Sequence, residues 1–449
     1  MWLSRHLHGI TSFAARTYYR ITVAGESIPA AGPVLLVANH PNSLMDPALV
    51  AAVSQRPVRF LARAPLLEAP LTGWMLRAWG AIPIYRRSDD PEKIARNTEM
   101  FSAVWSALAG NSVVGIFPEG VSHSEPSLVP LKTGAARIAL GAARNLGRYF
   151  PILPVGITFR GDKERFRSES LVLVGKPVRW DDLVRPRDPS PEEVRELTRR
   201  IRTGLSRITV NLEGWDDLPV VLGAEAIHDA EFSRNRGSTA SASEPMRWLV
   251  RVRRTASWLE RVRHGGGSDW EPLATEIAQH MRVLGALGVE ARDLHEIPKW
   301  SVAVRWTIRN LFFFGMATPL AMVGSIVFLP PYLLMTRAQP WFHLTPDRRA
   351  TYKVLGGAAC FGGWILLIAA TLREFMGWQP ALWTLGLLPL LGLLTLRIRD
   401  RWDVAVGDLK RILLHGRRDL RAQLLERQRT IAQRIQTFRR SPTPSDDID

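Results

Sequence analysis

The stretch VLLVANHPNSLMDP, residues 34–47, decides how this chain folds. Its first five residues are continuously apolar, which is typical of a strand buried on both faces of a mainly parallel sheet. The polar turn that follows carries His40 and Asp46, so both would lie at the carboxyl edge of the sheet, where open α/β sheets place ligands. An imidazole can remove a proton from a hydroxyl near neutral pH, and a carboxylate can fix its tautomer. The pair Asp46-Pro47 also fits a plain helix start, with Asp46 as the N-cap.

Short apolar runs of the same kind alternate with helical stretches on either side of this turn. The pattern predicts an α/β fold with a mainly parallel sheet flanked by helices. One connecting helix is signalled by Ser190, Pro191 and Glu193, which fit an N-cap, a first turn and a capping box. The predicted strands are 34–38, 58–62, 82–85, 112–117, 152–159 and 171–174.

The C-terminal half contains three long stretches without a charged residue: 27 residues after Arg309, 19 after Lys353 and 22 after Glu374. Each can span about 30 Å of hydrocarbon. Residues 397–440 carry 13 Arg and Lys against 5 Asp and Glu, and basic residues also precede the first stretch, so both flanks prefer the cytoplasm. Pro319, Pro330 and Pro331 interrupt the first stretch. An odd number of full spans would put the two flanks on opposite sides of the membrane, so we expect two full spans and one interfacial or re-entrant hairpin, with three spans as the alternative.

These patterns divide the chain into segments with different roles. The N-terminal amphipathic helix either packs on the following domain or lies on a membrane surface. We expect an N-terminal amphipathic helix at 1–20, an α/β domain at 21–232, a linker at 233–245, a helical accessory segment at 246–300, a helical transmembrane region at 301–400, a basic helix at 401–440 and a disordered tail at 441–449.

The composition narrows the classes of partner. A net charge of +17 over 449 residues favours negatively charged partners. Much of this charge lies beside the hydrophobic stretches rather than in a recognition motif, which favours anionic membrane lipid and argues against nucleic acid. The single cysteine, Cys360, excludes an intramolecular disulfide, and no Cys/His cluster has the spacing of a zinc site. We therefore expect no metal.

Further polar residues follow the other predicted strands. Arg86 and Arg87 come directly after the strand at 82–85, where guanidinium groups suit a phosphate. The strand at 112–117 is followed by Glu119, Gly120 and Ser122, whose carboxylate and hydroxyl can hydrogen-bond a polyol. Lys132, just before a helix rich in small residues, can also reach a phosphate.

In order and spacing, these blocks resemble the glycerolipid acyltransferase family, of the glycerol-3-phosphate and 1-acylglycerol-3-phosphate acyltransferase type. The family's His/Asp motif matches His40 and Asp46, and its Gly-x-Ile-x-Ile-x-Arg block matches residues 80–86. Its Phe-Pro-Glu-Gly block matches residues 117–120, and its Pro-Val block matches residues 154–155. The family usually leaves four residues between His and Asp, whereas this chain has five. The longer form resembles a branch of glycerol-3-phosphate and dihydroxyacetone-phosphate acyltransferases that also has Phe-Pro-Glu-Gly-x-Ser-His.

The resemblance implies a membrane-bound enzyme of phospholipid biosynthesis that moves a fatty acyl group from acyl-CoA or acyl-carrier protein to glycerol-3-phosphate. His40 would be the general base and Asp46 would orient it, while Arg86, Arg87 and Lys132 would hold the phosphate. Glu119, Gly120 and Ser122 would shape the acceptor pocket, and backbone N–H groups after Asp46 are candidates for an oxyanion site. No cofactor beyond the acyl donor is implied. The alternatives are a lysophosphatidate or other lyso-lipid acceptor, and a catalytically silent lipid-binding scaffold in the membrane.

Overall fold

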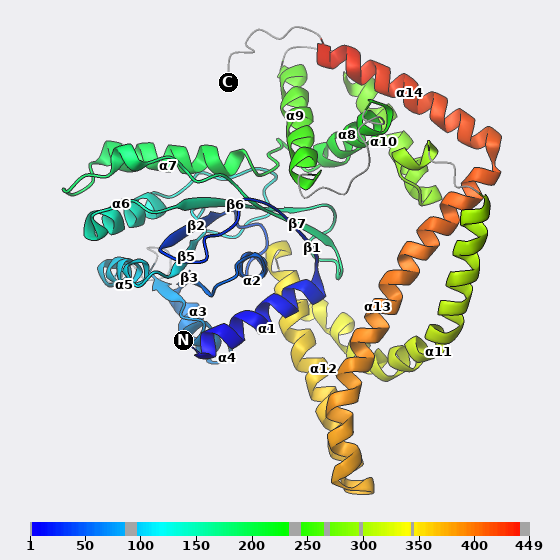
Figure 1. Cartoon of the computed structure of the whole chain (residues 1–449), viewed down its shortest axis with the longest axis horizontal. Helices are drawn as coiled ribbons and strands as arrows, with labels where there is room; N and C mark the ends of the chain where they lie inside the picture. Colours follow the sequence, from blue (N-terminus) through cyan, green and yellow to red (C-terminus); the bar gives the residue numbers. More distant parts are fainter. Residues whose placement is uncertain are drawn as a thin grey trace. The chain divides into compact units, whose positions relative to one another are not determined.

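The computed structural model describes residues 2–85, 97–232, 244–264, 270–295, 300–342 and 345–440 (Figure 1). The predicted tail at 441–449 and most of the predicted linker lie outside these residues. The chain forms two compact units, which we describe separately. The first comprises residues 1–215, 240–253 and 344–354, and the second comprises 216–239, 254–343 and 355–449.

The first unit is built on a sheet of seven strands within the described residues, in the order β1-β7-β6-β2-β5-β3-β4. Every neighbouring pair is parallel except β6 and β7. This confirms the α/β class and the mainly parallel sheet. The six predicted strands are present, but β1 was not predicted. The bounds are β1 Arg20–Gly25, β2 Val34–Ala38, β3 Val58–Arg63, β4 Ile82–Ile84, β5 Val113–Ile116, β6 Ile152–Phe159 and β7 Glu169–Val174.

Helices cover both faces of this sheet because the central strand β2 is apolar on both sides. Leu35 and Val37 belong to the hydrophobic core formed with α5 (Asn97–Ala109), α6 (Gly134–Leu146) and α7 (Pro191–Ser206). Leu36 and Ala38 point to the other face, in a core shared with α2 (Met45–Val53). Strand β2 is therefore fully buried, and the turn after it begins at the end of a strand that is packed on both faces.

The remaining helices of the first unit pack around this frame. Helix α1 (Trp2–Tyr18) lies on α2 and buries Ala15 completely, which confirms the packing role for the N-terminal helix, although Ile10 and Phe13 stay exposed. The capping box at the start of α7 is formed by Ser190 and Glu193 as predicted. The shorter elements are α3 (Ala64–Glu68), α4 (Pro70–Ala78) and the 3-10 turn Asp181–Leu183.

The second unit is helical in its described residues. Buried residues of α14 pack its apolar side against neighbours in this unit, and Arg434 pairs with Glu276 of α10. The predicted basic run 401–440 is helical but divides at Arg417. The helices are α8 (Asp217–Phe232), the part of α9 (Glu244–His264) that follows Arg253, α10 (Trp270–Leu287), a 3-10 turn at Ala291–Leu294, α11 (Trp300–Ala338), a 3-10 turn at Gln339–Phe342, α12 (Pro346–Met376) after its first turns, α13 (Trp378–Gly416) and α14 (Arg418–Arg440).

Three of these helices, α11, α12 and α13, are long and apolar enough to cross a membrane. The predicted interruption of the first stretch is wrong, because Pro319, Pro330 and Pro331 all lie within α11. Pro331 cannot donate to the carbonyl of Val327 one turn earlier. The indole N–H of Trp364 in α12 donates to that carbonyl instead, at 2.8 Å. The helix therefore continues because a neighbouring helix satisfies the freed group. The number of helices that cross stays a prediction.

Candidate active site

The candidate site forms where β2 and its neighbour β5 end. The two strands are parallel and pair Val37 with Ile116, an offset of 79 positions in the chain. The same offset continues beyond the strands, because the His40 backbone N–H donates to Glu119 Oε1 at 2.8 Å. It continues again at Ser43, whose N–H donates to Ser122 Oγ at 2.8 Å. The two loops thus run in step, which brings the two sequence motifs together.

His40 and Asp46 form a hydrogen-bonded pair, with 2.8 Å between Nδ1 and Oδ2. The same carboxylate oxygen accepts the backbone N–H of Asn42 at 2.7 Å. The five intervening residues fit because Ser43 adopts a left-handed conformation with φ of 48°, which tightens the turn before α2 begins. Because Nδ1 is held by Asp46, Nε2 is the ring nitrogen left to exchange a proton with a substrate.

One expectation about this helix start is wrong. Asp46 is not an N-cap, because the N-cap position of α2 is Leu44 and the Asp46 carboxylate faces back to His40 and Asn42. Met45 donates to the Asn42 carbonyl and Asp46 to the Ser43 carbonyl, while Pro47 has no N–H. An oxyanion site at the backbone N–H groups after Asp46 stays a prediction.

The two side chains of the pair differ in their exposure to solvent. Asp46 is fully buried, whereas the His40 side chain is 17% exposed. Burial raises the pKa of the Asp46 carboxyl, and the hydrogen bond from His40 offsets part of that rise. The pair therefore joins a buried carboxylate to a partly exposed imidazole.

Aromatic rings fix the plane of the imidazole. The His40 ring stacks on Phe117, with 4.0 Å between centroids and an angle of 14°. Phe117 stacks in turn on Phe60 at 5.7 Å and 10°. Phe60 lies against Gly115, where a Cβ atom would come within 2.4 Å of the ring. A glycine on β5 is thus required for the stack that orients His40.

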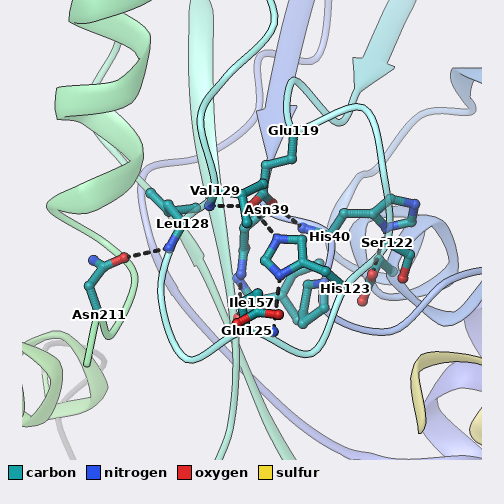
Figure 2. A network of polar contacts seen from close by, with 12 residues as sticks. Asn39, His40, Glu119, Ser122, His123, Glu125, Leu128, Val129, Ile157 and Asn211 are labelled. Atoms are coloured by element: carbon teal, nitrogen blue, oxygen red, sulfur yellow. Dashed lines mark hydrogen bonds and ion pairs between the residues drawn. The ribbon is translucent and has the colours of Figure 1, made fainter. Parts of the chain in front are cut away.

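Glu119 forms hydrogen bonds with the turn after β2 and with the loop after β5, as Figure 2 shows. It is 1% exposed. Its Oε1 accepts the His40 N–H, and its Oε2 accepts from the ring of His123 and from the Val129 backbone N–H. The hydrogen bond to Glu119 raises the pKa of His123. Both oxygens are occupied, so Glu119 holds the turn after β2 and the loop after β5 together, and its role in an acceptor pocket stays a prediction.

The other predicted residues are placed less uniformly. Gly120 has φ of +76°, which suits glycine, and the Lys132 side chain lies over it. Lys132 is exposed, and the Ser122 hydroxyl accepts a hydrogen bond from the Ser43 N–H. Arg86 and Arg87 lie outside the described residues. Strand β4, which precedes them, is parallel to β3, so its carboxyl end lies at the same edge of the sheet.

The sequence analysis missed three residues of the site, Asn42, Tyr19 and Lys163. Asn42 is fully buried and donates from Nδ2 to the Tyr19 hydroxyl at 2.7 Å. Lys163, from the loop after β6, donates to the Pro41 carbonyl and, at 2.8 Å, to Ser124 Oγ. Burial lowers the pKa of the Lys163 ammonium, although nearby carboxylates oppose this. Asn42 lies within the stretch 34–47, but Tyr19 and Lys163 are distant in the chain and belong to no motif, so no local signal marks their contacts with it.

A metal centre is not apparent in the part of the chain that the structure describes. No group of three or more His, Cys, Asp or Glu side chains there is placed to hold a metal ion. The expectation that the reaction needs no metal or other cofactor stays a prediction.

Comparisons with known proteins identify the domain that contains this site. Residues 20–158 match the model of the Acyltransferase family, and the chain therefore carries an acyltransferase-family domain.

Three of the matching curated relatives are named for activity on glycerol phosphates. The glycerol-3-phosphate O-acyltransferase 2 of Saccharomyces cerevisiae is 35% identical over 29% of this chain and 18% of its own length. The glycerol-3-phosphate O-acyltransferase 1 of the same yeast is 26% identical over 63% of this chain and 36% of its own length. The 1-acyl-sn-glycerol-3-phosphate acyltransferase of Streptococcus pneumoniae is 27% identical over 40% of this chain and 62% of its own length. The matches thus span about a fifth to three fifths of these relatives.

Proposed function

We propose that this protein is a membrane-bound O-acyltransferase that transfers a fatty acyl group from a thioester to the hydroxyl of glycerol-3-phosphate. The observation that carries the proposal is the hydrogen bond from His40 Nδ1 to the fully buried Asp46 carboxylate. It leaves Nε2 of a partly exposed imidazole at the carboxyl edge of the sheet. This is the arrangement that a general base for a hydroxyl needs.

In the proposed mechanism, Nε2 of His40 removes the proton of the acceptor hydroxyl as its oxygen attacks the thioester carbonyl. The C–O bond forms and a tetrahedral intermediate carries the negative charge. Collapse of the intermediate breaks the C–S bond, and the thiolate takes the proton from the His40 imidazolium. Asp46 keeps the tautomer and stabilises the imidazolium throughout. The thioester is already activated, so the transfer requires no resident cofactor.

The acceptor assignment rests on the sequence blocks and on the names of the relatives. Two relatives are named glycerol-3-phosphate O-acyltransferases. Arg86, Arg87 and Lys132 would supply the cations for the acceptor's phosphate. The donor, acyl-CoA or acyl-carrier protein, carries a phosphopantetheine thioester in both cases. A second candidate is lysophosphatidate, because one relative is named a 1-acyl-sn-glycerol-3-phosphate acyltransferase.

The three candidate membrane helices support a site for this reaction at the membrane surface. Three helices could cross a membrane, and the acyl chain and the product are apolar, so a site at the bilayer surface lets the product enter lipid directly. The excess of Arg and Lys in residues 397–440 supports a cytoplasmic position for this flank, and we propose the same side for the catalytic domain. Because the apolar side of α14 is packed, its contact with anionic lipid would use its basic side chains.

Acyl transfer by purified protein in vesicles tests this proposal. Labelled acyl-CoA and acyl-carrier protein would each be paired with glycerol-3-phosphate and with lysophosphatidate. His40→Ala should lower kcat by about 100-fold or more, with little change in KM. His6→Ala, at an exposed histidine of α1, is the matched control and should keep full activity.

The acceptor that is used separates the two candidate substrates. Activity that survives His40→Ala would refute the assigned base. Wild-type protein that binds lipid but transfers no acyl group with any pair would favour the silent scaffold.

A further inference from the structure

We propose that Lys163 is a positioning residue for the His40–Asp46 turn, and that the first turns of α12 hold Lys163 in place. The inference rests on the proposed function, because it assumes that this turn carries the catalytic base. All the residues involved belong to the first unit, which includes residues 344–354 at the start of α12.

Lys163 links two loops of the site. Its ammonium donates to the backbone carbonyl of Pro41, directly after His40, and to Ser124 Oγ at 2.8 Å. The carboxylates of Asp46, Asp347 and Glu164 all favour its charge. Lys163 therefore fixes the catalytic turn from the side of β6, opposite to the contacts made by Glu119 and Ser122 from β5.

Two tyrosines before β1 hold the backbone of Lys163 and its neighbour. The Tyr19 hydroxyl donates to the Lys163 carbonyl at 2.7 Å and accepts from the Asn42 side chain at 2.7 Å. The Tyr18 hydroxyl donates to the Glu164 carbonyl at 2.8 Å. The position of Lys163 and the position of the turn are thus set by one connected group of buried side chains.

The start of α12 closes this arrangement. Lys353 Nζ donates to the Glu164 carbonyl at 2.9 Å, and Arg349 Nη1 lies 3.3 Å from both Glu164 carboxylate oxygens. Ala350 between them is completely buried in the core beside the sheet. The uncharged stretch of α12 begins only after Lys353. One continuous helix therefore joins a candidate membrane span to the loop that positions the catalytic turn.

Kinetics of variants along this path test the inference. Lys163→Met should lower kcat by about 10- to 100-fold, as expected for a misplaced base, while KM for acceptor and donor stays within about twofold. Lys163→Arg should recover part of the loss, and Lys176→Met, at an exposed lysine after β7, should have no effect. Lys353→Met should lower kcat in the same direction, whereas Arg348→Ala, at an exposed neighbour, should not.

A double variant and hydrogen exchange separate positioning from simple loss of stability. Lys163→Met combined with Lys353→Met should be no slower than Lys163→Met alone, because both act through the same link. Amide exchange in residues 41–46 should accelerate in Lys163→Met while exchange in β2 and β5 stays unchanged. This readout does not require turnover.

The outcomes distinguish this inference from the proposed function. If wild type is active and His40→Ala is not, but Lys163→Met retains full kcat and unchanged exchange, the positioning role is refuted and the proposed function stands. If wild type transfers no acyl group, the proposed function fails, and faster exchange in residues 41–46 still supports the link.

Discussion

Replacing Asp46 with asparagine removes one charge from the dyad while keeping its shape. The asparagine oxygen should occupy the position of Oδ2, because the His40 Nδ1–H and the Asn42 N–H both need an acceptor there. The tautomer of His40 is then preserved. What disappears is the attraction between a carboxylate and the imidazolium that forms during proton transfer.

The size of that loss follows from the geometry. At 2.8 Å between Nδ1 and Oδ2, with an effective dielectric constant of about 20, two full charges attract by about 6 kcal/mol. If half of the charge has developed in the transition state, the loss is about 3 kcal/mol, which corresponds to about 100-fold in kcat. KM should change little, because Asp46 is fully buried and does not reach the substrate.

The stability of this variant relative to wild type should depend on pH. Burial raises the pKa of Asp46, so the folded protein binds this proton more tightly than the unfolded chain does. Ionised Asp46 therefore reduces the free energy of unfolding as pH rises above about 4, the value for an unfolded aspartate. Asp46→Asn removes that cost, but its amide nitrogen would take the place of Oδ1, which is buried and has no hydrogen-bond partner in the described residues. The Tm of the variant relative to wild type should therefore rise as pH increases from about 4 to neutral.

Steady-state kinetics in vesicles and thermal unfolding in detergent, each at neutral and acid pH, test the predicted changes in kcat and in Tm. A kcat within threefold of wild type would show that the charge of Asp46 does not contribute to the reaction. A Tm difference between the variant and wild type that is the same at acid and neutral pH would contradict the reasoning about the buried charge.

Two further substitutions probe the supports of the site. Glu119→Gln should leave a buried donor without a partner and lower the free energy of unfolding by about 2 kcal/mol. Because Glu119 raises the pKa of His123, their pairing stabilises the fold at acid pH, and this contribution disappears as pH rises. The Tm deficit of Glu119→Gln should therefore be larger below about pH 6.5 than above it; an equal deficit would contradict this. Gly115→Ala should displace the Phe60 ring, which supports Phe117 under the His40 imidazole, and lower kcat by about 10-fold. Gly134→Ala, with open space around it, should be neutral, and equal kcat values for the two variants would refute the role of the stack.

The parts of the fold that could be predicted are those with a strong local pattern. Strands such as Val34–Ala38 are continuously apolar because they are buried on both faces, and their bounds were predicted closely. Strand β1 was missed because it is half exposed and pairs only with β7 in the described residues. The continuous course of α11 was also missed, because the partner of the carbonyl freed by Pro331 is Trp364, 37 residues from Val327.

The candidate site could also be predicted from the sequence only in part. His40, Asp46 and Glu119 lie in short motifs, so their chemistry could be anticipated from residue type and from the ends of buried strands. Their contacts could not, because the pairing of His40 with Glu119 depends on β2 and β5 being neighbours, and strand order is set by the packing of the whole sheet. Lys163 belongs to no motif, and only the folded chain brings it to the turn.

The position of β2 within the sheet explains why the catalytic turn is so firmly held. β2 lies between β5 and β6, and each neighbour contributes to the same turn. From β5 come the acceptors for the N–H groups of His40 and Ser43, and from the loop after β6 comes the donor to the Pro41 carbonyl. A turn with one residue more than the family's usual spacing needs such restraint, because Ser43 must hold a left-handed conformation. The extra residue is therefore accommodated by contacts on both sides, and the distance between Nδ1 and Oδ2 is kept at 2.8 Å.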